Sequence, residues 1–189
     1  MSLSLHKQLI IGIVLATLLV LTRSQHFADL HHLPGASWAV FFLAGVYIQS
    51  RWGLAAFFSI AFSLDFSVYM SGVNISCFTP AYGMLLPAYA SLWMAGRWYA
   101  KQHDLTFTSL LLLSGAVLVG TFSCELFSSG GYYLFSGKFE PSLSEFASRL
   151  VQYYPSYLGS TAFYVTLAAL IHSIIAGVQR LNGWELKAH

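Results

Sequence analysis

The chain has 189 residues, of which 57% are apolar and only 8% are Asp, Glu, Lys or Arg. Soluble domains carry roughly 25% charged residues, so this composition excludes an ordinary soluble fold and predicts an integral membrane protein. The net charge is only +2, and no cluster of Lys and Arg indicates binding to nucleic acid.

Six apolar segments follow one another along the chain, with no linker that would divide it into domains. Each approaches the roughly 17–25 residues that a membrane-spanning helix needs, and none alternates as a barrel strand does. Because backbone groups in lipid must be hydrogen-bonded internally, we predict an all-α fold of six transmembrane helices in a single domain, residues 1–189. The predicted helices cover residues 5–22, 35–50, 53–71, 82–100, 105–128 and 156–178.

The distribution of Lys and Arg over the links predicts the orientation. With the N-terminus inside, more of these residues fall on the inner side, which favours cytoplasmic termini in a bacterial inner membrane. The links 23–34, 72–81 and 129–155 then lie outside. The inner residues are Lys7, Arg51, Arg97, Lys101, Arg180 and Lys187, and the outer ones are Arg23, Lys138 and Arg149.

The first apolar segment carries Gly12 and Ala16, small residues about one helical turn apart. Small residues at this spacing let two membrane helices approach closely. The pair is either a docking face for a partner subunit or an ordinary packing contact within the bundle.

The link after the first segment contains three histidines, His26, His31 and His32. Imidazole is a common metal ligand, so a metal site is one interpretation. No carboxylate or thiolate sits at helical spacing with all three, and a plain polar outer loop is the alternative.

The stretch from Asp65 to Tyr82 concentrates chemistry that is rare in this chain. Asp65 lies within the third apolar segment near its outer end, where a bare carboxylate is costly unless it is hydrated, paired or protonated. Arg149 is the outer cation that we expect to pair with it. Asp65 then either recognises a polar edge of a ligand or forms an Asp65–Arg149 ion pair that fixes the outer region.

The two cysteines, Cys77 and Cys124, are both predicted near the outer surface. They show neither CxxC nor zinc-type spacing. Three roles are open to Cys77: a disulfide with Cys124 on the oxidising side of the membrane, an inert buried thiol, or a soft ligand to a metal centre.

Glu125 is an ionisable residue near the outer end of the fifth segment. Ionisable groups within membrane helices are functional candidates by default, and the alternative is a carboxyl shallow enough to be hydrated. His172, in the sixth segment, is a lone histidine for which hydrogen-bonded packing is the simpler interpretation.

The link between the fifth and sixth segments is predicted to contain a short amphipathic helix. Apolar residues recur at helical spacing from Leu143 to Tyr154, Ser142 and Glu145 form a capping-box pattern, and Pro155 is expected to end the helix. This helix either rests in the lipid head groups or covers the outer mouth as a lid.

Several enzyme classes are excluded because their motifs do not occur. The glycine-rich run that ends at Lys138 has the wrong spacing for a P-loop, and Phe139 follows it in place of Ser or Thr, so no nucleotide is expected. Neither HExxH nor GxSxG occurs in the chain.

Six short spans, cytoplasmic termini, an elaborated outer face and no ATPase motif resemble the substrate-binding S-components of energy-coupling-factor vitamin transporters. The sequence that follows Asp65 and reads SCFTPAY from Ser76 to Tyr82 resembles the BtuM family of solitary S-components for vitamin B12. The resemblance covers the whole chain in architecture. In motif it rests mostly on residues 65–82, with support from Arg149.

This resemblance implies a membrane-embedded uptake component that binds cobalamin at its outer face. Cys77 would supply a thiolate to an axial position of the corrin cobalt. Asp65, Tyr82 and Arg149 would contact the amide-bearing edge of the corrin. A thiolate at this position would also assist reductive removal of cyanide from cyanocobalamin, which is the only catalytic role expected of Cys77.

In the wider transporter family, two alanines on the first helix dock the coupling ATPase module. Here Gly12 replaces the first alanine, and solitary members lack neighbouring coupling subunits, so the need for an ATPase partner is open. The residues also leave two other functions open. These are a membrane thiol or redox enzyme that uses Cys77 and Cys124, and an S-component for another vitamin. A scaffold whose outer helix binds a second membrane protein is a further class.

Overall fold

The structure is a computed structural model that describes residues 3–23, 34–72, 80–104, 106–137 and 142–181, the last three by their backbone alone. All regular secondary structure in these ranges is helical. The described part of the chain therefore confirms the all-α prediction. Cys77 and the three histidines of the first link lie outside the described residues.

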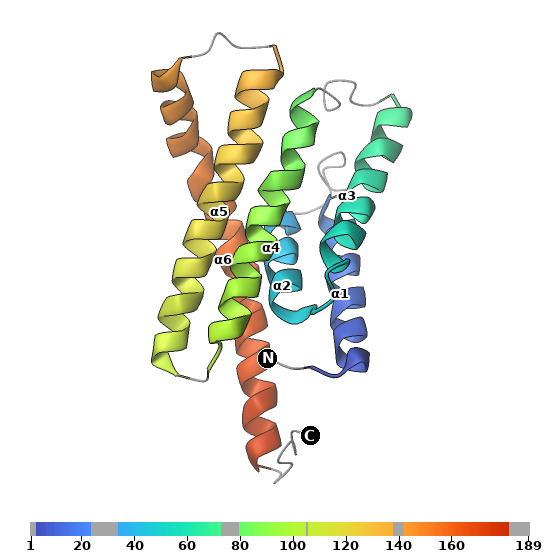
Figure 1. The fold of residues 1–189 in the computed structure, drawn as a ribbon, viewed down its shortest axis with the longest axis vertical. Coiled ribbons are helices and arrows are strands. Elements are labelled where there is room, and N and C mark those ends of the chain that lie inside the picture. Colours follow the sequence, from blue (N-terminus) through green and yellow to red (C-terminus); the bar gives the residue numbers. More distant parts are fainter. Residues whose placement is uncertain (1–2, 24–33, 73–79, 105, 138–141, 182–189) are drawn as a thin grey trace.

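Six α-helices and a short 3-10 helix stand beside one another as a bundle (Figure 1). Their order along the chain is α1 (Leu5–Arg23), α2 (Ser37–Tyr47), α3 (Gly53–Met70), η3 (Pro80–Met84), α4 (Leu85–Gln102), α5 (Phe107–Phe135) and α6 (Leu143–Leu181).

Four of these helices, α1, α3, α5 and α6, are long and apolar enough to cross a membrane. The chain is therefore a helical, multi-pass membrane protein. Helix α2 has only 11 residues, which span about 16 Å at 1.5 Å per residue, or about half of a hydrocarbon core. It is shorter than the predicted segment 35–50. Helix α4 is not among the four candidate spans of the described chain.

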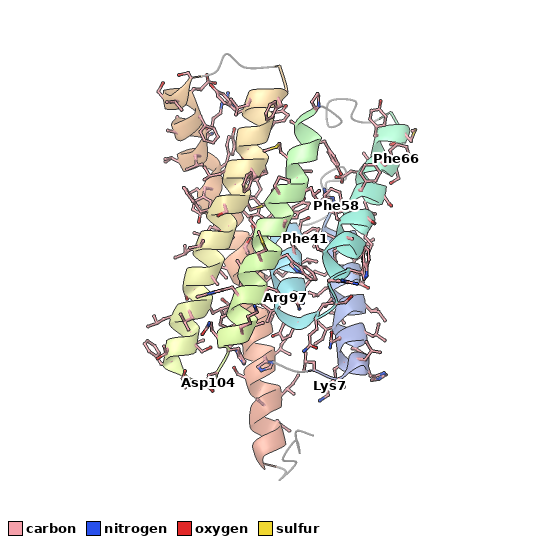
Figure 2. The ribbon with its side chains drawn as sticks, viewed as in Figure 1. Lys7, Phe41, Phe58, Phe66, Arg97 and Asp104 are labelled. Atoms are coloured by element: carbon pink, nitrogen blue, oxygen red, sulfur yellow. The ribbon has the colours of Figure 1, made fainter. Side chains whose placement is uncertain are left out.

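The bundle has two ends, which we name after residues that mark them. At the Pro80 end, α3 and α5 finish and α4 and α6 begin; at the Lys7 end, α1 and α5 begin and α4 and α6 finish (Figure 1). Figure 2 shows Phe66 toward the first end and Lys7 and Asp104 at the second. The start of α1 and the finish of α6 thus share one end, as an even number of crossings requires.

The core is built around α2, in which every residue from Ala39 to Val46 is buried. Phe41 stacks on Tyr89 of α4 with ring centroids 4.1 Å apart, and it meets Phe57 of α3 edge to face. Offset aromatic contacts of this kind stabilise a core beyond the area that they bury. A helix apolar on all sides has to be enclosed by protein or lipid, and α2 is enclosed by its neighbours.

Helices α2 and α4 approach so closely that only glycine fits at two positions. A Cβ atom on Gly45 would lie 2.3 Å from the carbonyl oxygen of Trp93, and one on Gly96 would lie 2.1 Å from that of Phe42. Small residues allow this separation between membrane helices. The contact fixes α4, and with it Tyr89, against the core helix.

Arg97 of α4 binds the carboxyl-terminal end of α2. Its guanidinium donates hydrogen bonds to the carbonyl oxygens of Ile48 at 2.7 Å and Gln49 at 2.5 Å. These carbonyls follow the last turn of α2, where helix carbonyls lack intrahelical partners and a cation is favourable. Arg97 therefore holds the Lys7 end of the α2–α4 pair.

The structure corrects the prediction of a separate amphipathic helix after α5. Residues from Leu143 onward form the first part of a single 39-residue helix, α6, and Pro155 lies inside it. Figure 1 shows this part standing upright beside α5, and it does not lie across the end of the bundle. Leu143 and Val151 of the predicted apolar stripe are 89% and 73% exposed, whereas Phe146 packs against Tyr133 of α5, so only part of the stripe faces the protein.

Candidate functional site

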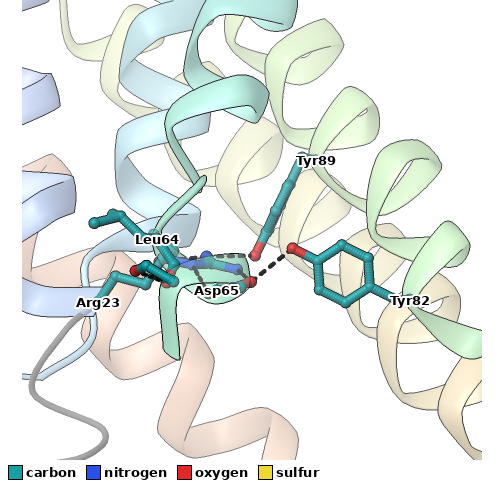
Figure 3. A network of polar contacts seen from close by, with 7 residues as sticks. Arg23, Leu64, Asp65, Tyr82 and Tyr89 are labelled. Carbon is teal, nitrogen blue, oxygen red and sulfur yellow. Dashed lines mark hydrogen bonds and ion pairs between the residues drawn. The ribbon is translucent and has the colours of Figure 1, made fainter. Parts of the chain in front are cut away.

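Asp65 pairs with Arg23, and this overturns the expected pairing with Arg149. The Arg23 Nε and Nη2 atoms donate to the two Asp65 carboxylate oxygens at 2.7 and 2.5 Å (Figure 3). The side chains are only 11% and 18% exposed. Two parallel N–H···O bonds between these groups are the strongest arrangement for an arginine–carboxylate pair. The attraction between the two ions offsets the free-energy cost of removing each of them from water.

Three hydroxyl groups complete this cluster, which we call the Arg23–Asp65 network. The Tyr82 hydroxyl donates to Asp65 Oδ2 at 2.7 Å. Arg23 Nη1 donates to the hydroxyl oxygens of Tyr89 at 2.9 Å and Ser37 at 3.2 Å. Figure 3 shows the tyrosines reaching the pair from one side. The network joins five elements: α1, α2, α3, η3 and α4.

Each member sits where its element brings it to the Pro80 end. Arg23 is the last residue of α1, and Ser37 is the first of α2. Pro80 begins the 3-10 helix that carries Tyr82, because its fixed φ suits a first helical turn. The stack on Phe41 holds the Tyr89 ring in place.

Tyr82 is partly exposed, whereas Tyr89 is buried. Burial raises the pKa of Tyr82 above the ordinary tyrosine value, and its hydrogen bond to the Asp65 carboxylate raises it further. The phenol therefore stays protonated through the neutral range and keeps donating to Asp65. Tyr82 is the third residue after the stretch 73–79 in the sequence, so the network is close along the chain to Cys77.

Arg149 lies apart from Asp65. It donates to Glu145 Oε1 on the same helix at 2.8 Å from Nη2 and 3.2 Å from Nε. The two side chains are 35% and 44% exposed. No hydrogen bond or ion pair joins Arg149 to Asp65 within the described residues. Since charged pairs four residues apart on a helix are weak, this contact does not fix Arg149 strongly.

Cys124 is a free thiol, fully buried in α5. Cys124 therefore does not form the disulfide that was one of the three roles left open for Cys77. Cys124 is close enough to Tyr89 for the two groups to interact electrostatically. A buried thiol without a cation or metal beside it is unreactive.

Glu125, the next residue, is a fully buried carboxyl group. The Ser129 hydroxyl donates to its Oε1 atom at 2.6 Å. Its Oε2 atom is buried and has no hydrogen-bond partner. The interpretation of Glu125 as a shallow, hydrated group is therefore wrong, and the carboxyl is enclosed within the protein.

Gly12 and Ala16 are both half-buried on α1. A Cβ on Gly12 would lie 3.5 Å from the Ile48 side chain, and Ala16 packs against the core. This face of α1 therefore contacts its own bundle. The exposed face of α1 carries larger residues, among them Ile13 at 66% exposed. Docking of a partner at Gly12 and Ala16 stays a prediction.

A cavity of about 370 Å³ opens at the Lys7 end, far from the Arg23–Asp65 network. His103 and His172 line it with ring centroids 5.2 Å apart. The Tyr99 hydroxyl bonds His103 Nδ1 at 2.9 Å and Ser109 Oγ at 3.2 Å. No group of three metal-ligating residues occurs here or elsewhere in the described ranges. His172 thus has aromatic neighbours, which fits the packing role predicted for it.

Three members of the site were missed by sequence reasoning: Arg23, Ser37 and Tyr89. Arg23 was one of only three cations predicted on the outer side, so it was a candidate partner that spacing alone could not select. Ser37 and Tyr89 carry no sequence signal, because their role depends on where α2 and α4 meet.

Comparison with known proteins returned no match, either to a protein-family model or to a curated protein. The functional argument therefore rests on the residues and their geometry.

Proposed function

We propose that the protein is a cobalamin-binding uptake component of a bacterial inner membrane, with its ligand site at the Pro80 end facing outward. The observation that carries the proposal is the Arg23–Asp65 network, a buried ion pair that ends in the Tyr82 hydroxyl. It adjoins the segment whose sequence resembles the solitary B12-binding family. In this arrangement α4, and the short α2 together with its flanking residues 34–36 and 48–50, complete six crossings, and both termini are cytoplasmic.

The network suits a large, neutral, amide-bearing ligand. Arg23 and Asp65 cancel each other's charge, so the site offers no net charge that would select an ion. Tyr82, which is only partly buried, provides a flat ring and a hydroxyl group, which combine contact area with hydrogen bonding at low ordering cost. A corrin ring with peripheral amides has this mixture of flat apolar surface and polar edge.

Cys77 is proposed to bind the cobalt of the ligand through its thiolate. Thiolate is a soft donor that suits late first-row metals, and metal binding drives off the thiol proton at neutral pH. Asp65, Tyr82 and Arg149 are proposed to contact the polar edge of the ring. Arg149 belongs to this set only if the exposed Glu145 pair opens, because that pair occupies its guanidinium in the structure.

Removal of cyanide from cyanocobalamin is proposed as an accessory activity. An external thiol reductant would supply one electron, Co(III) would become Co(II), and cyanide would leave with the electron pair of its bond to cobalt. Cys77 would hold the opposite axial position. An energy-coupling ATPase module is a proposed partner, with Gly12 and Ala16 as its contact.

A thiol or redox enzyme that uses both cysteines is not favoured. Cys124 is fully buried, and thiol chemistry needs an accessible thiolate.

The proposal is tested by growth of a bacterium that requires external cobalamin and lacks its own importer. Wild-type chain should restore growth on low cobalamin, and Cys77→Ala should abolish most of the effect. Cys124→Ala, which removes the other thiol, is the matched control and should grow like wild type. Failure of wild-type chain to restore growth while present in the membrane would contradict the uptake function.

A further inference from the structure

Glu125 is the one buried acid that the proposed site does not yet use. Its carboxyl is half satisfied: Ser129 donates to Oε1 at 2.6 Å, while the buried Oε2 has no partner. Glu125 itself is fully buried. Buried polar atoms in folded proteins are nearly always hydrogen-bonded, so an exception calls for an explanation such as a missing ligand.

Within the described ranges of the chain, no cation forms an ion pair with Glu125. Both ion pairs of the described residues, Arg23–Asp65 and Arg149–Glu145, involve other acids. An ionised carboxylate enclosed without a cation is very unfavourable. A neutral carboxylic acid is expected here, and it offers both a hydrogen-bond donor and an acceptor.

Electrostatic interactions connect Glu125 and its neighbour in sequence to the Arg23–Asp65 network. That neighbour, Cys124, is within electrostatic range of Tyr89, the network's hydroxyl on α4. Tyr157 of α6 is within range of both Glu125 and Tyr89. It stacks on Trp38 of α2 with centroids 4.8 Å apart.

An aromatic side chain near Glu125 is not sealed into the core. Tyr157 is 44% exposed, and it lies within electrostatic range of the fully buried Glu125. A ligand that packs on this exposed ring would therefore lie near Glu125.

We infer that Glu125 is a second binding residue of the outer site, where its free Oε2 hydrogen-bonds an uncharged primary amide of the ligand. The inference rests on the proposed function, because cobalamin carries such amides around its ring. An amide presents an N–H donor and a C=O acceptor, which match the acceptor and donor of a neutral acid. A cationic group is disfavoured, since the acid would have to ionise in its enclosed position.

The decisive experiment compares ligand affinity and ligand-free stability in the same variants. Glu125→Leu removes both oxygens and fills the space, so the ligand-free melting temperature should stay level or rise, because the unsatisfied buried oxygen is gone. Its affinity for cyanocobalamin, measured by equilibrium dialysis of the full chain in detergent, should fall about 10-fold or more. Glu125→Gln keeps a neutral donor and acceptor and should stay within about 3-fold of wild type.

The control is Thr121→Val, which alters a fully buried polar residue one turn away on α5. It should leave the affinity unchanged. If Glu125→Leu binds cyanocobalamin like wild type, Glu125 is not a ligand contact. If it loses stability and affinity together, its role is structural and the inference falls.

An infrared spectrum gives an independent readout. A carboxylic-acid C=O band should be present in wild type and Thr121→Val, absent in Glu125→Gln, and displaced when cyanocobalamin is added. A C=O band that does not shift when cyanocobalamin is added would overturn the inference, even if the affinity for cyanocobalamin changed. Absence of cyanocobalamin binding by wild type would instead overturn the proposed function and, with it, this inference.

Discussion

The Arg23–Asp65 pair shows how one buried carboxylate organises its surroundings. Three hydroxyl groups from separate elements meet these two side chains, which are 11% and 18% exposed. In water such a pair would contribute little. Away from water, removal of either partner leaves an uncompensated charge, so the pair fixes α1 against α3 whether or not a ligand is bound.

Asp65→Asn is therefore expected to destabilise the protein by about 3 kcal/mol, because Arg23 stays buried with no opposing charge. The melting temperature of the detergent-purified chain measures the loss. Glu145→Gln removes the acid of the exposed pair on α6 and is the matched control, with an expected change below about 1 kcal/mol. Equal losses in the two variants would show that the Asp65 pair contributes no more than a surface contact.

His103 gives the protein a predicted sensitivity to acid. Burial lowers the pKa of His103 below the ordinary histidine value, and the neighbouring His172 lowers it further. The unfolded chain therefore binds a proton at this residue more readily than the folded one, so stability falls as the pH drops below about 6.5. Above that pH, the contribution of neutral His103 to the stability of the folded chain is fully retained.

The melting temperature measured between pH 8 and pH 5, in roughly equal steps, tests this effect. The decrease in melting temperature at acidic pH should be smaller in His103→Gln, because glutamine cannot be protonated in this range. His6→Gln, which alters an exposed histidine on α1, is the control and should follow wild type. A His103→Gln profile identical to wild type would show that this residue does not contribute to acid sensitivity.

At the scale of the elements, the α2–α4 contact decides where the site residues lie. Backbone meets backbone at Gly45 and Gly96, with no room for a Cβ atom. Separation of these helices would carry Tyr89 away from Phe41 and Arg23. The precision of the network thus depends on two glycines that do not belong to it.

Gly96→Ala should cost at least about 2 kcal/mol, because the added methyl group collides with the Phe42 carbonyl and forces the helices apart. Thermal unfolding measures this cost. Gly115→Ala on α5 is the control: a Cβ there meets nothing within 4 Å, and alanine favours a helix over glycine by up to about 1 kcal/mol. Destabilisation by both variants alike would contradict the close contact.

Helix α6 shows how packing overrides a local stop signal. Proline removes one backbone hydrogen bond and strains the preceding turn, which predicted an end at Pro155. The segment before it, however, is held against α5: Tyr154 bonds Thr121 at 3.1 Å, and Phe146 lies over Gly130. The Tyr133 hydroxyl also accepts from the Ser142 backbone at 2.8 Å. These contacts keep the chain helical across the proline.

At the scale of the whole molecule, apolar length predicted the first and third helices closely, while the predicted segments 105–128 and 156–178 are shorter than α5 and α6. Segments 5–22 and 53–71 match α1 and α3 within a residue or two, because long apolar runs leave the backbone no other way to satisfy its polar groups. The predicted segment 35–50 is longer than helix α2, which covers Ser37–Tyr47. Enclosure by neighbouring helices lets α2 be short, and hydropathy along one chain does not reveal enclosure.

The candidate site was predicted only in part. Asp65 and Tyr82 were identified from the sequence, and the structure joins them at 2.7 Å. Their partner was assigned wrongly, because any outer cation satisfies a sequence argument and only tertiary packing brings Arg23 to Asp65. Glu125 was recognised as a candidate, yet its free oxygen became evident only from the packed structure.

The central claim is that cobalamin binds at the Pro80 end with Cys77 on its cobalt. The visible absorption spectrum of purified chain incubated with cobalamin, wild type beside Cys77→Ala, tests it most directly. We predict bound corrinoid in wild type with bands displaced from those of the free vitamin, and no such displacement in Cys77→Ala. Unchanged bands in both would remove Cys77 from the cobalt, and absence of bound corrinoid in wild type would contradict the account as a whole.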